Sequence, residues 1–188
     1  MSKHFFIIHA WDESPESCWY PWLKQVLETK GYKATIPAMP NSEAPELNAW
    51  VNTLKSLVPS PNHETYFIGH SIGCQTILRY LADLGNDQQI GGAIFVAPWT
   101  TMPMGLGEAS QAIAKPWVET PIDWQAAKAH CPQFSALFSD NDEWVPLSEE
   151  KIFQEKLSAK TQVIRDMGHF DTMNELPKLS ALIQEIVG

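Results

Sequence analysis

A serine between two glycines is the arrangement in this sequence that most directly suggests chemistry. It lies in residues 69–73 (Gly-His-Ser-Ile-Gly), directly after an apolar, β-rich run at 66–68 and before a helical segment at 74–84. A sharp strand-to-helix turn of this kind, a nucleophile elbow, holds its serine in a strained backbone conformation, and the glycines keep strand and helix from colliding. The sequence therefore predicts Ser71 as a nucleophile at the edge of a sheet. The plainer alternative is an ordinary glycine-rich turn.

A serine hydroxyl needs partners, because an alkyl hydroxyl is a weak nucleophile near neutral pH. An imidazole must take its proton, and a carboxylate must fix the tautomer of that imidazole. Asp142 follows a strand-like run at 132–139, and His169 follows a shorter one at 161–165. The chain order Ser71, Asp142, His169 is the order found in α/β-hydrolases. We therefore predict these three residues as a catalytic triad.

The acid and the base each have an alternative interpretation. Asp140 and Glu143 lie beside Asp142 in the same polar segment. The spacing Asp-x-x-Val-Pro favours Asp142, while Asp140 stays open as a competitor. His169 could instead be a histidine of a surface loop.

Acyl transfer also requires hydrogen-bond donors at the position where the tetrahedral intermediate develops negative charge. The amide of Ile72, directly after the serine, is the first expected donor of this oxyanion hole. The second is expected in the loop after the first strand, where we choose the Trp11 amide and keep the Ala10 amide as the alternative. We expect His9 to order this loop and His70 to pack at the elbow.

These residues lie far apart in the chain, so a scaffold must bring them together. Strand-like and helix-like segments alternate, and the first strand is apolar throughout, which is typical of a parallel sheet covered on both faces. The expected strands are 4–9, 33–36, 66–68, 92–97, 132–139 and 161–165. The expected helices are 19–30, 47–58, 74–84, 123–129, 148–157 and 175–187. The pattern predicts one α/β domain over residues 1–188, with a mostly parallel sheet flanked by helices.

Residues 99–121 interrupt this alternation, because they contain glycines and prolines without a sustained helical period. We interpret the segment as a small lid over the site. Its adaptable apolar side chains would favour a small, apolar acyl group. The side chains expected to cover or line the pocket are Trp99, Met102, Met104, Trp117 and Trp144.

The composition excludes several classes of partner. The 188-residue chain has a formal net charge of −9 and only 13 lysines and arginines, so a nucleic-acid-binding surface is not expected. No apolar run reaches the ~18 residues that a membrane span requires. The 3 cysteines have no metal-ligand spacing and indicate neither a disulfide framework nor a zinc site. With no signal segment before the first strand, we expect a cytoplasmic protein that needs no metal or cofactor and acts on a small-molecule substrate.

Beyond the elbow, several longer segments form a distinctive set. These segments are 8–11 (IHAW), 14–16 (SPE), 19–23 (WYPWL), 69–73 (GHSIG) and 142–146 (DEWVP). Together they resemble the small serine hydrolases of the retinoblastoma-binding-protein-nine-like family, over essentially the whole chain. The resemblance implies a compact α/β-hydrolase with almost no cap domain, and Ser71, Asp142 and His169 as its triad. The sequence departs from such hydrolases at His9-Ala10, where they usually carry His-Gly, so we expect a differently shaped loop.

The sequence is thus interpreted as a serine hydrolase that cleaves small carboxylic esters or amides through an acyl-serine intermediate. Two alternatives stay open. The scaffold could be a protein-interaction module without turnover, because fold alone does not fix function. The same triad could also serve an acyltransferase or a thioesterase.

Overall fold

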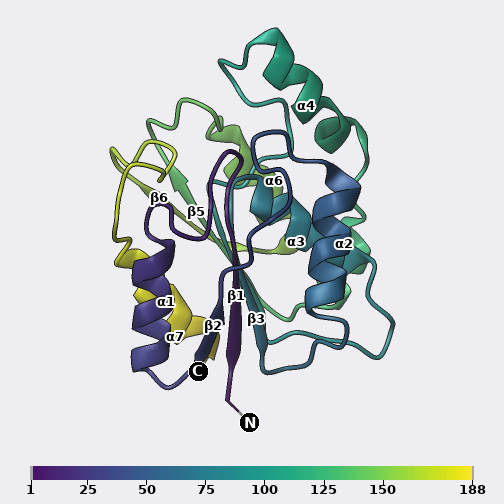
Figure 1. The fold of residues 1–188 in the computed structure, drawn as a ribbon, viewed down its shortest axis with the longest axis vertical. Coiled ribbons are helices and arrows are strands. Elements are labelled where there is room, and N and C mark those ends of the chain that lie inside the picture. Colours follow the sequence, from purple (N-terminus) through teal and green to yellow (C-terminus); the bar gives the residue numbers. More distant parts are fainter. Residues whose placement is uncertain (1, 188) are drawn as a thin grey trace.

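The computed structural model describes residues 2–187 and gathers six strands into one central sheet (Figure 1). The strand order is β2-β1-β3-β4-β5-β6, and every neighbouring pair is parallel. The strands are β1 (His4–Ile8), β2 (Lys33–Thr35), β3 (Thr65–His70), β4 (Gly92–Val96), β5 (Phe134–Ser139) and β6 (Lys160–Ile164). This arrangement confirms the α/β fold class. Met1 and Gly188, the ends of the single domain expected over 1–188, lie outside the described residues.

The four inner strands are buried almost throughout, whereas the edge strands β2 and β6 are partly exposed. The inner strands consist mainly of β-branched, aromatic and other apolar residues, which suit a sheet that is covered on both faces. Parallel strands end at the same edge of a sheet, so the residues that follow them meet there. Ile8 pairs with Gly69, and Gly69 with Phe95. The register therefore brings the loops after β1, β3 and β4 side by side.

Helices cover both faces of the sheet, with α1 and α7 on one face and α2 and α3 on the other (Figure 1). The helices are α1 (Tyr20–Thr29), α2 (Leu47–Leu57), α3 (Ile72–Ala82), α4 (Glu108–Glu119), α5 (Trp124–Ala129), α6 (Ser148–Leu157) and α7 (Lys178–Val187). The N-cap predicted for α5 is present, because the carboxylate of Asp123 accepts a hydrogen bond from the Ala126 amide at 2.9 Å. No helix within residues 2–187 is both long and apolar enough to cross a membrane.

The segment 99–121, expected to lack a sustained helical period, contains the twelve-residue helix α4. This expectation was wrong because Pro116, one of the prolines that indicated an irregular segment, lies inside α4, where a proline normally breaks a helix. Only Ala114 and Trp117 of this helix are buried. The helix stands apart from the others at one end of the molecule (Figure 1). The buried guanidinium of Arg79, on α3, donates to the carbonyls of Trp117, Thr120 and Pro121. It thereby fastens the end of α4 to the body of the protein.

The last helix, α7, begins at Lys178 rather than at the predicted residue 175. Pro177 precedes it, and a proline disfavours helical backbone at the residue before it. The other helices and strands lie within about two residues of their predicted bounds, and this includes β3, which extends the short predicted elbow strand at both ends.

Candidate active site

Ser71 occupies a strained turn between β3 and α3. Its backbone has φ 53° and ψ −119°, a conformation that serine adopts only where its surroundings impose it. A Cβ atom on Gly73 would lie 2.4 Å from the carbonyl oxygen of Ile8, and one on Gly69 would lie 2.8 Å from the amide nitrogen of Cys74. Both glycines are therefore required by close backbone approach. The geometry is that of a nucleophile elbow.

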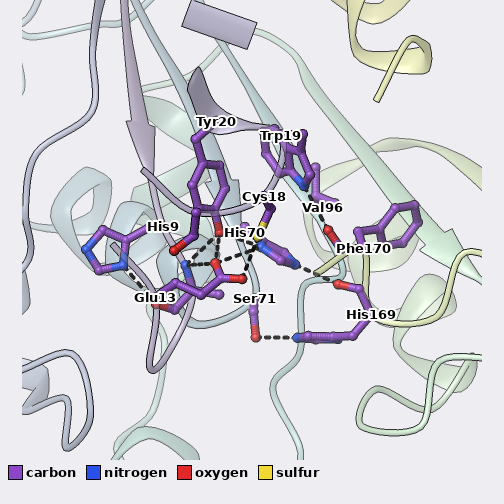
Figure 2. Close-up of polar contacts among 12 residues, drawn as sticks. His9, Glu13, Cys18, Trp19, Tyr20, His70, Ser71, Val96, His169 and Phe170 are labelled. Atoms are coloured by element: carbon purple, nitrogen blue, oxygen red, sulfur yellow. Dashed lines mark hydrogen bonds and ion pairs between the residues drawn. The ribbon is translucent and has the colours of Figure 1, made fainter. Parts of the chain in front are cut away.

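The structure brings Ser71, His169 and Asp142 together in one line (Figure 2 shows its first two members). The Ser71 hydroxyl lies 2.9 Å from Nε2 of His169, and Nδ1 of His169 lies 2.9 Å from Oδ2 of Asp142. Oδ1 of Asp142 also accepts the amides of Trp144 and Val145, at 2.9 and 3.0 Å. These two backbone bonds orient the carboxylate toward the histidine. A carboxylate accepts, so Nδ1 carries the ring proton and Nε2 is free to accept from the serine.

The competing acidic residues have other positions. Asp140 accepts the Asp166 amide at 2.9 Å through Oδ1, and so it ties the end of β5 to the turn after β6. Glu143 is exposed to solvent. Of the three carboxylates, Asp142 is the one that contacts His169.

Two residues that the sequence analysis missed hold the turn before His169. Asn141 accepts the Gly168 amide at 2.8 Å through its side-chain oxygen, and Ser139 accepts the Met167 amide at 3.0 Å through its hydroxyl. Ser139 ends β5 and Asn141 follows it, and both bind the loop after the neighbouring strand β6. Their only signal in the sequence is a polar cluster beside Asp142, which does not reveal the partner.

The loop after β1 carries the amides considered for the oxyanion hole. The Ala10 amide is already bound, because it donates to the Tyr20 hydroxyl at 3.0 Å and to a Glu13 carboxylate oxygen at 3.2 Å. No acceptor for the Trp11 amide occurs among residues 2–187. Ile72 begins α3, so its amide has no partner within the helix. The geometry therefore favours Trp11 over the alternative Ala10.

At the end of β1, where the sequence departs from His-Gly, the loop turns at a later residue than Ala10. Ala10 does not take a positive φ; Asp12, two residues later, does so with φ 60°. His9 accepts the Met39 amide at 3.0 Å through Nε2, which leaves Nδ1 to donate to the Ala10 carbonyl at 2.8 Å. His9 thus ties this loop to the chain after β2.

A buried polar network links the loop after β1 to His169 (Figure 2). The Glu13 carboxylate accepts from the Tyr20 hydroxyl and, at 2.7 Å, from the Cys18 thiol. His70 bonds Tyr20 at 2.6 Å through Nδ1 and the carbonyl of His169 at 2.7 Å through Nε2. His70 therefore does more than pack at the elbow, because it joins β3, the strand before Ser71, to the backbone of His169.

The network stabilises the ionised form of Glu13. Burial by itself would raise the pKa of this carboxyl group, but the hydrogen bond and the charge of His70, with the bonds from Cys18 and Tyr20, lower the pKa to about 2. Burial, followed by the nearby Glu13, raises the pKa of the Cys18 thiol and of the Tyr20 hydroxyl. Glu13 is thus an acceptor and its two neighbours are donors at neutral pH.

A cavity of about 320 Å³ opens beside Ser71 and His169. Three tryptophans, Trp11, Trp99 and Trp144, form much of its wall. Three acidic residues also line it: Asp12, Glu13 and Asp171. From the segment before and within α4 it receives Pro103, Leu106 and Ser110.

Met102 and Trp117, which were expected in the pocket, lie outside the lining of this cavity. Trp117 is buried and points into the protein, where its indole donates to the Pro45 carbonyl at 3.0 Å and packs edge-on against Trp50. Met102 packs against the hydrophobic core. Of the residues of α4, Ser110 lines the cavity, whereas Trp117 is buried elsewhere. Met104, also expected to cover the site, is 43% exposed.

Comparison with known protein families matches residues 5–185 to the family described as serine hydrolase. The chain belongs to this family. This serine hydrolase is 32% identical over 174 residues to the protein YdeN of Bacillus subtilis (strain 168), a stretch that covers 90% of this chain and 87% of YdeN. It is 27% identical over 153 residues to serine hydrolase RBBP9 of Rattus norvegicus, covering 81% of this chain and 77% of RBBP9. The resemblance noted in the sequence is thereby confirmed.

Solved structures agree on the fold. The crystal structure of the Bacillus subtilis ydeN product superposes with a TM-score of 0.90 at 27% identity and covers 99% of both chains. Est1E from Butyrivibrio proteoclasticus superposes with a TM-score of 0.74 at 14% identity, over 99% of this chain and 87% of Est1E. The second likeness is one of fold alone. The protein is an α/β-hydrolase in architecture.

Proposed function

We propose that this serine hydrolase cleaves small carboxylic esters or amides through an acyl-serine intermediate. In this proposal Ser71 is the nucleophile, His169 is the general base and acid, and Asp142 orients the histidine. The observation that carries it is the line of hydrogen bonds from Ser71 through His169 to Asp142, beside a cavity. Each donor in this line faces an acceptor, which supports proton transfer from hydroxyl to imidazole.

In acylation, Nε2 of His169 takes the hydroxyl proton as Ser71 Oγ bonds to the carbonyl carbon of the substrate. The carbonyl oxygen becomes an oxyanion, for which the amides of Ile72 and Trp11 are the proposed donors. When this intermediate collapses, the bond to the leaving alcohol or amine breaks. The leaving group takes the proton from His169.

In deacylation, a water molecule replaces the leaving group. His169 takes a proton from the water as its oxygen bonds to the acyl carbon, and the same amides bind the second oxyanion. Collapse breaks the bond between the acyl carbon and Oγ, and His169 returns the proton to Ser71. The products are a carboxylic acid and the free enzyme.

The cavity supports a small substrate. Its volume of about 320 Å³ lies at the lower end of the ~300–1,000 Å³ typical of ligand pockets. Indole surfaces favour apolar groups, and each buried methylene contributes ~0.8 kcal/mol, roughly fourfold in specificity. Short p-nitrophenyl esters should therefore be cleaved, with efficiency rising over the first methylenes and falling once the cavity is full.

Two measurements on purified protein test the proposal. A fluorophosphonate probe should label the wild-type protein but not Ser71→Ala, and p-nitrophenyl acetate should be hydrolysed by the wild type alone. A wild-type protein that neither reacts with the probe nor cleaves the ester would favour an interaction module. A product dominated by transfer to added alcohol, with little hydrolysis, would favour an acyltransferase.

The free thiols give information on the cellular compartment of the protein. Cys18, Cys74 and Cys131 form no disulfide with one another. Unpaired cysteines persist in reducing surroundings, and this supports the proposal of a cytoplasmic enzyme. Fractionation of cells that express the protein would test it.

A further inference from the structure

The indole of Trp99 makes a contact that the proposed triad does not explain. Trp99 is 2% exposed, and its Nε1 lies 3.1 Å from Oγ of Ser71. An indole nitrogen can only donate, so the direction of this bond is fixed. Ser71 therefore accepts from Trp99 and has its own proton left to donate to His169, whose Nε2 lies 2.9 Å away.

Other buried or partly buried tryptophans in the chain satisfy their indole N–H groups differently. Trp19, Trp50 and Trp117 donate to backbone carbonyls, at 3.0, 2.8 and 3.0 Å. Such bonds are the ordinary way to accommodate an indole N–H in a core. Trp99 instead donates to the oxygen atom that would form and break the acyl bond.

The position of Trp99 is held from both sides. Before it, the end of β4 lies beside the elbow, where the Ser71 amide donates to the Val96 carbonyl at 2.8 Å. After it, Thr100 and Thr101 donate to the fully buried carboxylate of Glu149, at 2.6 to 2.8 Å. A donor fixed in this way need not reorganise when charge develops at its acceptor.

We propose that Trp99 is a catalytic residue whose indole N–H stabilises negative charge on Ser71 Oγ in both half-reactions. The proposal rests on the hydrolase function proposed above. In acylation, Oγ gains negative charge as its proton moves to Nε2 of His169 and before its bond to the acyl carbon is complete. In deacylation, Oγ is the leaving atom, and it gains negative charge as the C–Oγ bond breaks and before His169 returns the proton.

The two hydrogen bonds of Ser71 also leave its oxygen a lone pair for the attack. A hydroxyl oxygen has two lone pairs, of which the Trp99 bond occupies one. The proton points to His169, and the second lone pair remains available for the substrate. The same bond therefore fixes the rotamer of Ser71 and supports its charge.

The test removes the N–H while preserving the shape of the side chain. Incorporation of β-(3-benzothienyl)alanine at position 99 replaces the indole N–H with sulfur, and Trp99→Phe provides a second variant that needs no unnatural residue. Stopped-flow measurements with p-nitrophenyl acetate give the acylation rate from the burst and the deacylation rate from the steady state. We expect both rates to fall by about ten- to a hundredfold. This decrease lies between the effect of losing an ordinary hydrogen bond and the effect on rate of losing a donor of an oxyanion hole.

Trp117 offers a matched control. It is equally buried, at 1% exposure, and it also loses one indole hydrogen bond when altered, but it lies outside the cavity. The same two replacements at Trp117 should leave both rates within about twofold of the wild type. A benzothienyl variant at position 99 whose rates equal or exceed those of the wild type would overturn the proposal.

The outcome is separable from a failure of the proposed function. If the wild type shows neither a burst nor fluorophosphonate labelling, the hydrolase mechanism itself is wrong. If the wild type reacts and the Trp99 variants react equally fast, only the role of Trp99 is wrong. A decrease in acylation without a decrease in deacylation would also contradict the proposal, because Oγ carries charge in both steps.

Discussion

Ser71 shows how much of the site could be found from single residues. The φ of Ser71 is 53°, and Ile8 approaches Gly73 closely, so this turn requires glycines at fixed positions. These glycines flank Ser71 in the sequence as the Gly-x-Ser-x-Gly pattern. His70 lies in the same pattern, but its contact with Tyr20 spans 50 residues and has no local signature. The strained turn at Ser71 was therefore predictable, whereas the contacts that support it were not.

Substitutions in the proposed triad should differ sharply in effect. Ser71→Ala and His169→Ala should each abolish nearly all turnover, and Asp142→Asn should reduce kcat by ~10⁴ because it favours the wrong histidine tautomer. Asp140→Asn keeps the oxygen that accepts the Asp166 amide, so its kcat should stay close to the wild-type value. Steady-state kinetics on a p-nitrophenyl ester would measure all four variants. A larger loss in Asp140→Asn than in Asp142→Asn would reassign the acid.

Adding one methyl group at the elbow should be costly for the fold. The new Cβ in Gly73→Ala would lie 2.4 Å from the Ile8 carbonyl oxygen, so backbone must move, and we expect a loss of about 3 kcal/mol in the free energy of unfolding. Gly107→Ala is the control, because its φ is −70° and no atom lies within 4 Å of the new Cβ. That variant should stay within about 0.5 kcal/mol of the wild type in urea unfolding. Equal unfolding midpoints for the two variants would contradict the steric argument.

At the level of elements, the sheet places each side chain of the proposed triad beyond the carboxyl end of a strand. The alternation of apolar strands and amphipathic helices made this arrangement predictable, since each segment shows the spacing of apolar residues that is typical of its type of secondary structure. The helix α4 was not predictable in this way, because it contains Pro116, a residue that normally breaks a helix, and buries only two of its residues. The polar bonds of Glu13, Asn141 and Ser139 join separate elements and depend on the assembled fold. The local sequence does not specify such partners.

The network of Glu13, Tyr20 and His70 links the loop after β1 to the end of β3. Because of Glu13, the free energy of unfolding should decrease as the pH becomes acidic. The pKa of Glu13 is about 2 in the folded protein, against a usual value of 4.5. As the pH falls below about 4.5, the unfolded chain binds a proton at this position before the folded protein does, and stability decreases until about pH 2. Glu13→Gln removes this contribution, which is up to about 3 kcal/mol at neutral pH. The difference in unfolding free energy between wild type and variant should therefore shrink as the pH falls.

Urea unfolding at a series of pH values from 7 to 2.5 would measure this dependence. Glu16→Gln, an exposed glutamate in the same loop, should follow the wild-type curve. A constant difference between wild type and Glu13→Gln across this range would show that the network does not hold Glu13 as a carboxylate.

For the molecule as a whole, the negative charge disfavours the binding of anionic ligands. The net charge of −9 is accompanied by three carboxylates in the wall of the cavity. The overall charge could be calculated from the composition, but the gathering of Asp12, Glu13 and Asp171 around one cavity depends on loops from both ends of the chain. Substrates with a negative acyl group should therefore be repelled at the site as well as at a distance.

Esters that differ only in charge would measure this repulsion. We expect kcat/KM for mono-p-nitrophenyl adipate to be at least about tenfold below that for its neutral methyl ester. The gap should narrow when salt is raised from about 0.1 to about 1 M, because the Debye length falls from ~10 to ~3 Å. Equal rates for the two esters at low salt would contradict this interpretation of the cavity.

The separation of Ser71 and His169 along the chain has a consequence for biosynthesis. The two residues are 98 positions apart, so at ~5–20 residues per second the ribosome adds the proposed base roughly 5–20 s after the proposed nucleophile. The strands on both sides of the elbow precede His169 in the chain, whereas the serine has no proton acceptor until the turn after β6 has been made. During most of translation, Ser71 of the nascent polypeptide should therefore not react with acyl or phosphonyl groups. Reactivity toward a phosphonate would then report that the newly made chain has completed its sheet.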